Sequence, residues 1–361
     1  MRALTLLLAT VVLTTNLTAQ EQQAKKKKDK KEPTQIELVP HEAAHLFTAE
    51  TPVAFTLTAN FGRLRRDKSP DAPWRAATIS FTDSTGGAID IPIKAKTRGI
   101  WRLNNCDFPP IRLDFAKSTV KHSLFAKLDK PKLVTHCRDN DDYEQYLLQE
   151  MQLYRVYNLL TAYSHRVRLA RVTYADSGTG KTVATRYAFL AEEPDAVAYR
   201  VGGMLAKEKG AGPSELDPKL AAIFSVFEYL IGNTDWSVSG LHNVELVSDA
   251  AGDYVPIAYD FDFSGAVNTR YATPDPRLPI RRVRDRVYRG YCYPTEVYAP
   301  VFELFRAKKD SIYALYKDSI GQLLKGDRGK ETLEYFDEFY KVIDDQRQAK
   351  REIIDRCLGG G

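Results

Sequence analysis

The sequence predicts an α+β fold with two lobes, a β-rich N-lobe over residues 35–197 and a mainly helical C-lobe over residues 198–361. Several segments of the first half alternate apolar and polar residues, as half-buried strands do. In the second half, residues 219–231 are apolar on nearly every side, which is typical of a buried helix. The chain also exceeds the usual size of one domain, which indicates two lobes that share a cleft.

The N-lobe is expected to be a sheet with one long helix. A turn containing Gly86 and Gly87 separates two alternating segments and predicts a hairpin. The helix is expected to begin at Asp142, which has Gln145 at capping-box spacing, and to run to about Tyr163. The strands are expected over residues 53–59, 77–81, 89–96, 109–115, 131–135, 166–174 and 182–192.

The buried helix of the C-lobe has clear start and stop signals. Asp217 can cap its first turn, and Pro218 fits the first helical position. Gly232 is expected to end it. Residues 244–247 and 254–259 then predict two strands of a hairpin, and two helices rich in Tyr, Phe and Lys are expected after residue 295.

The N-terminus has the layout of a secretory signal peptide, predicted over residues 1–19. Arg2 precedes an apolar run over residues 3–13, which is too short to span a bilayer, and Ala19 offers a cleavage point. Residues 20–34 are rich in lysine and nearly free of apolar residues, which predicts a disordered tail. We therefore expect a secreted or periplasmic protein with no transmembrane segment in its mature chain.

The positive charge of the chain is concentrated in this tail. Residues 25–32 contain six Lys, one Asp and one Glu, and so hold +4 of the net charge of +5. The nearly neutral body argues against nucleic acid as the main ligand, because such binding depends on clustered Lys and Arg.

Four cysteines, Cys106, Cys137, Cys292 and Cys357, follow the signal peptide. An even number in an exported protein predicts disulfides, for which three pairings are possible. Cys106 with Cys137 is the preferred pair, since both flank the same small region. No Cys-x-x-Cys spacing is present, which argues against a cysteine-based zinc site.

Polar residues with metal-binding and catalytic potential follow the buried helix. Asp235 lies in the loop after it, Asn243 precedes the first hairpin strand, and Asp260 and Asp262 follow the second. A short hairpin would bring Asn243 and Asp260 to one end. Phosphoryl transfer needs a carboxylate near the acceptor hydroxyl and oxygen ligands for magnesium, and this order of residues supplies both. The alternative is that these residues are ordinary turn formers that bond to their own backbone.

The N-lobe contains a lysine and a glutamate that could form a buried ion pair. Lys132 opens a predicted strand, and Glu150 lies on an otherwise apolar face of the next helix. A carboxylate there is costly unless it is paired, so an ion pair between the two is expected, with Lys94, Lys96 and Arg112 as rival cations. Kinases use such a pair to hold the nucleotide phosphates, so Lys132 and Glu150 are candidate ATP-binding residues. A surface lysine and a partly exposed glutamate are the alternative.

Several motifs together resemble the CotH (spore-coat protein H) kinase family. They are residues 93–99 (IKAKTRG), 106–115 (CDFPPIRLDF), 132–137 (KLVTHC), 187–193 (YAFLAEE), 232–236 (GNTDW) and 256–265 (PIAYDFDFSG). The resemblance covers residues 45–300, is closest to uncharacterised secreted bacterial members, and implies an atypical protein-kinase-like fold. It also implies ATP-dependent phosphorylation of Ser or Thr in an extracytoplasmic protein, with Mg²⁺ or Mn²⁺.

The resemblance also implies roles for individual residues. Asp235 would be the catalytic carboxylate, and Asn243 and Asp260 would be metal ligands, with Asp262 as the rival to Asp260. Arg98 and Gly99 would lie near the phosphates, and residues 190–193, which include Glu192, would contact adenine. Two departures stand out: Asn243 follows Asp235 by eight residues, where protein kinases have five, and Ile100-Trp101-Arg102 replaces small polar residues.

Other functions are compatible with parts of the sequence. A catalytically inactive, pseudokinase-like binding or cell-surface scaffold protein would explain the same motifs in a compartment where ATP is scarce. An arginine-rich stretch could bind acidic partners or be a solvated or packing face: Arg277, Arg281, Arg282, Arg284, Arg286 and Arg289. His41-Glu42-Ala43-Ala44-His45 matches the zinc-protease pattern, and would need a helix to bring the two histidines to one face.

Overall fold

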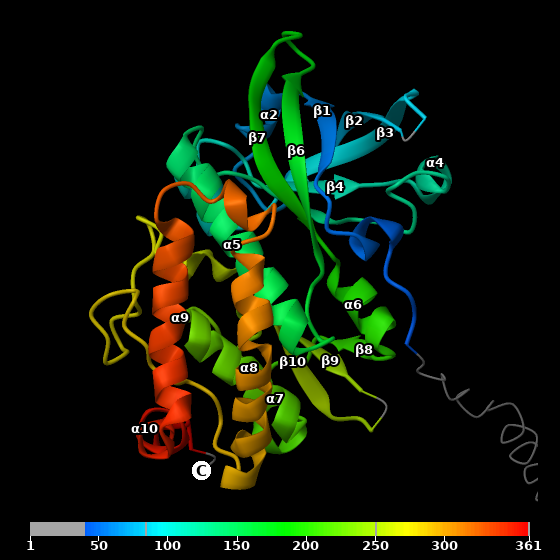
Figure 1. Ribbon diagram of the computed structural model, residues 1–361. Coiled ribbons are helices and arrows are strands. Elements are labelled where there is room, and N and C mark those ends of the chain that lie inside the picture. Colours follow the sequence, from blue (N-terminus) through cyan, green and yellow to red (C-terminus); the bar gives the residue numbers. More distant parts are fainter. Residues whose placement is uncertain (1–39, 84, 250, 360–361) are drawn as a thin grey trace, which may run out of the picture. The chain divides into compact units, whose positions relative to one another are not determined.

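Seven strands close into a β-barrel in the computed structural model, which describes residues 40–83, 85–249 and 251–359 (Figure 1). The strands are β1 (Val53–Ala59), β2 (Arg75–Thr82), β3 (Ala88–Thr97), β4 (Ile111–Asp114), β5 (Lys132–Val134), β6 (Val167–Asp176) and β7 (Thr182–Ala191). Their order around the barrel is β1-β2-β3-β4-β5-β7-β6. β1 pairs in parallel with β6, and the other pairs of the barrel are antiparallel.

This closure shows that the predicted bilobed, atypical protein-kinase-like fold is wrong. The individual strands lie within a few residues of their predicted positions, but they form a closed mixed barrel. Closure depends on the parallel pairing of β1 with β6, in which Val53 lies opposite Ala170. The alternation of apolar and polar residues shows that a strand has a buried face, but it does not identify a partner so far away in the chain.

A second, antiparallel sheet follows in the chain, with the order β10-β9-β8. Its strands are β8 (Met204–Ala206), β9 (Val244–Ser248) and β10 (Tyr254–Ala258). The α-helices are α2 (Phe61–Leu64), α3 (Trp101–Asn105), α4 (Lys117–Val120), α5 (Asp141–Leu160), α6 (Pro194–Val201), α7 (Pro218–Ile231), α8 (Thr295–Leu315), α9 (Arg328–Asp344) and α10 (Gln346–Glu352). The short 3₁₀ helices are η1 (His45–Thr48), η2 (Pro213–Glu215), η3 (Phe261–Phe263), η4 (Gly321–Leu323) and η5 (Ile354–Arg356). The helices α7, α8 and α9 stand side by side (Figure 1).

The core has two large parts. Alternate strand residues such as Leu57, Ile79 and Leu113 fill the barrel. A second cluster joins α5 to α7, α8 and α9. Because α5 is buried along most of its length, it carries the polar side chain of Glu150 into the interior.

The ends of α7 confirm the predicted signals. Asp217 Oδ1 accepts a hydrogen bond from the Leu220 N–H at 2.7 Å, and Gly232 ends the helix with a φ of 64°. For α5 the predicted cap is wrong: the side chain of Asn140 accepts from the Tyr143 N–H, and Asp142 lies inside the first turn.

Gly232→Ala is expected to destabilise the protein by about 2 kcal/mol or more, because the left-handed backbone and the lack of space both oppose a side chain. An added Cβ would lie 1.9 Å from the Tyr335 Oη. Chemical denaturation can measure the loss. Gly86→Ala is the matched control, since Gly86 also has a positive φ but nothing lies within 4 Å of its added Cβ. Equal losses for the two variants would contradict the steric argument.

The structure describes two disulfides, Cys106–Cys137 and Cys292–Cys357. The first confirms the preferred pair, and such bonds are typical of exported proteins. Within the described ranges, no helix is long and apolar enough to cross a membrane. The predicted signal peptide (residues 1–19) and lysine-rich tail (residues 20–34) lie outside the described residues, and the predicted division at residue 197 stays a prediction.

Candidate functional site

The β9–β10 hairpin brings Asn243 and Asp260 to one end, as predicted. Ala258 lies opposite Val244 in the register, and the Tyr259 N–H donates to the Asn243 carbonyl at 3.2 Å. Both Asn243 and Asp260 have left-handed backbones, with φ values of 53° and 66°. Such conformations are unfavourable for residues other than glycine and are concentrated at functional sites. The hairpin end therefore fixes the backbone from which both side chains extend.

Asp235 is joined directly to this hairpin end. The Asn243 side-chain amide donates to the Asp235 carbonyl at 2.7 Å and to its Oδ2 at 3.1 Å. The Asp235 Oδ1 lies 2.8 Å from the His242 Nε2. Because Asn243 uses its amide nitrogen for these bonds, its Oδ1 is the atom that can act as a metal ligand.

Two arginines of the arginine-rich stretch fix the loop and the end of α7. Arg289 donates to the Trp236 carbonyl at 2.9 Å and to the Thr234 carbonyl. Arg286 donates to the Tyr229 carbonyl at 3.1 Å. These contacts are those of a packing face and not of a surface for acidic partners. Two exposed members of the stretch form ion pairs within the protein, Arg277 with Asp275 and Arg282 with Asp285.

A cluster of acids lies behind the hairpin end. Asp262 is buried and accepts a hydrogen bond from the Tyr271 hydroxyl at 2.9 Å. Burial, together with the charge of Asp260, raises the pKa of Asp262 to about 6. Glu150 is 1 % exposed, and neither of its carboxylate oxygens has a hydrogen-bond partner among the described residues. Burial and the nearby Asp262 raise the pKa of Glu150 well above its usual range.

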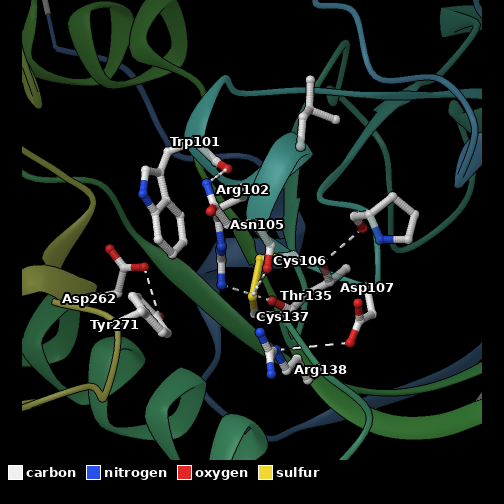
Figure 2. Close-up of a disulfide and its surroundings, with 12 residues drawn as sticks. Trp101, Arg102, Asn105, Cys106, Asp107, Thr135, Cys137, Arg138, Asp262 and Tyr271 are labelled. Atoms are coloured by element: carbon white, nitrogen blue, oxygen red, sulfur yellow. Dashed lines mark hydrogen bonds and ion pairs between the residues drawn. A yellow bond between two sulfur atoms is a disulfide. The ribbon is translucent and has the colours of Figure 1, made fainter.

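Arg102 is the main cation that faces these acids. Its charge opposes the burial effect on the pKa of both Asp262 and Glu150. One guanidinium nitrogen donates to the Thr135 carbonyl at 3.1 Å. Figure 2 shows the Arg102 side chain running past the Cys106–Cys137 disulfide, with Asp262 and Tyr271 on its other side. Since Cys106 immediately follows α3, the disulfide fixes the short helix that carries Arg102.

The expected ion pair between Lys132 and Glu150 is absent from the described part of the chain. The Lys132 Nζ instead lies 4.3 Å from the centre of the Tyr259 ring. Burial and the charge of Arg98 lower the pKa of Lys132 to about 8, while the charge of Asp260 opposes the shift. The pattern on α5 predicted a buried carboxylate correctly, but its cations are Arg102 and Arg98.

Lys132 lines a small cavity with three other predicted residues, Arg98, Glu192 and Asp260. The cavity holds about 20 Å³, which is room for about one water molecule. The Glu192 carboxylate is engaged by Arg200 at 2.9 Å. Gly99 follows Arg98 in the segment after β3 and is exposed. A nucleotide would therefore need this cavity to open.

The two candidate metal ligands of the Asp-Phe-Asp sequence have different surroundings. Asp260 reaches the cavity, and its N–H donates to the Tyr154 hydroxyl at 2.9 Å. Asp262 is buried and already bonded to Tyr271. These surroundings agree with the preference for Asp260 as the main ligand, which stays a prediction.

The zinc-protease pattern does not have the geometry it needs. His45 opens η1, whereas His41 lies before it, outside any helix, and stacks on the Tyr199 ring at 3.7 Å. The two histidines therefore do not share a helical face, and the described ranges contain no group of three His, Cys, Asp or Glu residues arranged to hold a metal ion.

Sequence reasoning missed four residues of this region: Tyr154, His242, Tyr271 and Arg102. For Arg102 a signal existed, because Ile100-Trp101-Arg102 departs from the CotH pattern. For His242 there was none, since its bond to Asp235 depends on how the loop folds back on itself. In comparisons with known proteins, no family model and no curated protein matched the chain.

Proposed function

We propose that the protein transfers the γ-phosphoryl group of ATP to Ser or Thr hydroxyls of an extracytoplasmic protein. The observation that carries the proposal is the bonded pair of Asp235 and Asn243 at the hairpin end where Asp260 also lies. Lys132 and Arg98 line the same cavity as Asp260. The resemblance to the CotH kinase family supports the same reaction. The proposal rests on this site and not on a bilobed fold.

The donor set fits a magnesium or manganese ion. Mg²⁺ is usually held by one or two carboxylates together with water and phosphate oxygens, so a full cage of protein ligands is not needed. Asp260 and the Asn243 Oδ1 would hold the ion, and Asp262 could join them. When bound, such an ion neutralises negative charge on the phosphates.

The residues of the chain then have distinct tasks. Asp235 accepts the proton of the acceptor hydroxyl, whose oxygen forms a bond to the γ-phosphorus. The bond from that phosphorus to the bridging oxygen breaks, and ADP leaves with the electron pair. His242 and Asn243 orient the Asp235 carboxylate through their hydrogen bonds. Lys132 and Arg98 supply positive charge for the phosphates.

The proposed site of action is outside the cytoplasm. Two disulfides in the described residues support this, because such bonds persist in oxidising compartments. The predicted signal peptide points the same way.

Transfer of label from γ-labelled ATP, with Mg²⁺ or Mn²⁺, tests the reaction on the protein itself and on a generic acidic protein. We expect label with the wild type and a loss of about a hundredfold or more in Asp235→Ala, as for removal of a general base. Absence of label, together with no thermal stabilisation by ATP and metal, would overturn the proposal.

A second candidate function is binding or scaffolding without catalysis. The observation that favours it is the small volume of the Lys132 cavity, about 20 Å³, together with the ion pair that Glu192 of its wall makes with Arg200. Thermal stabilisation by ATP and metal that is lost in Asp260→Ala, without any transfer of label, would support this candidate over the first.

A further inference from the structure

We propose that a second cavity beside Asp235 binds the acceptor protein and selects a large apolar or aromatic side chain next to the acceptor hydroxyl. The inference rests on the proposed function, whose acceptor class it narrows. The cavity holds about 330 Å³ and has Asp235 and Thr234 in its wall. It shares no lining residue with the Lys132 cavity, so the side chain next to the acceptor hydroxyl would not compete with the nucleotide for space.

Much of the remaining wall is apolar. Trp101 and Phe263 form one part, with their ring centres 5.5 Å apart and their planes perpendicular. Pro274, Pro276 and Val283 also line the cavity. Such surfaces gain free energy by excluding water from an apolar ligand.

The apolar surface continues outside the cavity. Trp101 is 38 % exposed, and its neighbour Ile100 is 74 % exposed. Large apolar side chains that stand together in water mark binding surfaces more often than single ones do. This pair lies at the start of α3, beside the wall that contains Asp235.

The charges of the cavity are largely satisfied within the protein. Asp275 accepts two hydrogen bonds from the Arg277 Nε and one from its Nη2. Asp235 is bonded to His242 and Asn243. Neither carboxylate therefore needs a cationic ligand, while both would disfavour an acidic one. Thr234 and Thr273 also line the cavity, so an apolar flanking residue is matched by the Trp101 side of the wall and not by the whole lining.

The size and rigidity of the cavity are suited to a large apolar side chain. Its volume is at the small end of ligand pockets, which favours one large side chain with adjoining backbone. The Cys106–Cys137 disulfide holds the end of α3, and so holds Trp101 in place before the acceptor arrives (Figure 2). Such preorganisation reduces the entropy cost of binding.

Three labelled peptides that differ only in the residue next to a single Ser test the inference: Phe, Ala or Glu. Binding is measured by fluorescence anisotropy without nucleotide, and phosphate transfer is measured separately. We expect the Phe peptide to bind about tenfold more tightly than the Ala peptide, from burial of its ring, with the Glu peptide weakest. Trp101→Ala should abolish the difference, and Trp101→Phe should restore part of it.

Tyr199→Ala is the control, because Tyr199 is an exposed aromatic residue that lines neither cavity. It should keep the wild-type order of peptides. Equal binding of the three peptides, or an order that Trp101→Ala leaves unchanged, would overturn the inference even if label transfer succeeds. Selective binding that depends on Trp101 would support it even if no peptide is phosphorylated, in which case the proposed reaction fails and the binding site stands.

Discussion

Replacing both Cys106 and Cys137 by Ser is expected to lower the free energy of unfolding by about 4 kcal/mol, and to impair the site as well. The stability loss follows from the sequence separation of 31 residues, because the open chain gains that much conformational freedom when unfolded. The effect on the site follows from α3, since Cys106 follows the helix that carries Trp101 and Arg102. Misplacement of these residues should reduce transfer by about 10- to 100-fold.

The second disulfide provides a matched control for this prediction. Cys292–Cys357 spans 65 residues, so Cys292→Ser with Cys357→Ser should cost a similar 4 kcal/mol or so. Its cysteines line neither the Lys132 cavity nor the cavity beside Asp235. Urea denaturation and label transfer, compared for the two double variants, separate stability from positioning. Equal losses of transfer in folded samples of both would contradict a special role for the α3 disulfide.

Local signals in the sequence were sufficient to predict α7 and the β9–β10 hairpin, which together position Asp235 and Asn243. The start and end of α7 depend on Asp217 and Gly232, each of which acts within one turn of its own position. The hairpin follows from two short apolar segments and the turn between them. Its proximity to Asp235 could therefore be anticipated from neighbouring residues alone.

Contacts between residues far apart in the chain could not be predicted from these local signals. Barrel closure requires β1 to pair with β6, more than a hundred residues away, and either strand would show the same alternation with another partner. The prediction of an ion pair between Lys132 and Glu150 was wrong for a related reason. Helical periodicity showed which face of α5 is buried, but not that α3 would place Arg102 against that face.

Two buried histidines are expected to lower the free energy of unfolding as the pH decreases below about 6.5, because they resist protonation in the folded state. Burial lowers the pKa of His136 to about 4 and that of His165 to about 3. His136 is fully buried, and neither ring nitrogen has a hydrogen-bond partner in the described part of the chain. Nearby cations add to the shifts, Arg186 at His136 and Lys132 at His165.

The direction of this pH effect follows from the histidine pKa values in the folded and unfolded states. In the unfolded chain a histidine has a pKa of about 6.5, so between that pH and the lowered native value only the unfolded state takes up the proton. The stability contributed by each ring is complete above pH 6.5, and about 2 kcal/mol of it is lost by pH 5. Glu150 and Glu228, whose pKa values are raised by burial, act in the opposite direction. The pH dependence of the intact protein is therefore a sum of opposing effects.

Substitution isolates the contribution of one ring. His136→Phe keeps an aromatic ring beside Phe108, whose ring centre is 4.2 Å away, and removes the titrating group. We expect its loss of stability between pH 7 and 5 to be smaller than that of the wild type by about 2 kcal/mol, whatever the offset in absolute stability. His122→Phe changes an exposed ring and should keep the wild-type slope. If His136→Phe gave the same slope as His122→Phe, the His136 ring would have to be protonated as readily in the folded state as in the unfolded one, which its burial among Phe108 and Tyr174 opposes.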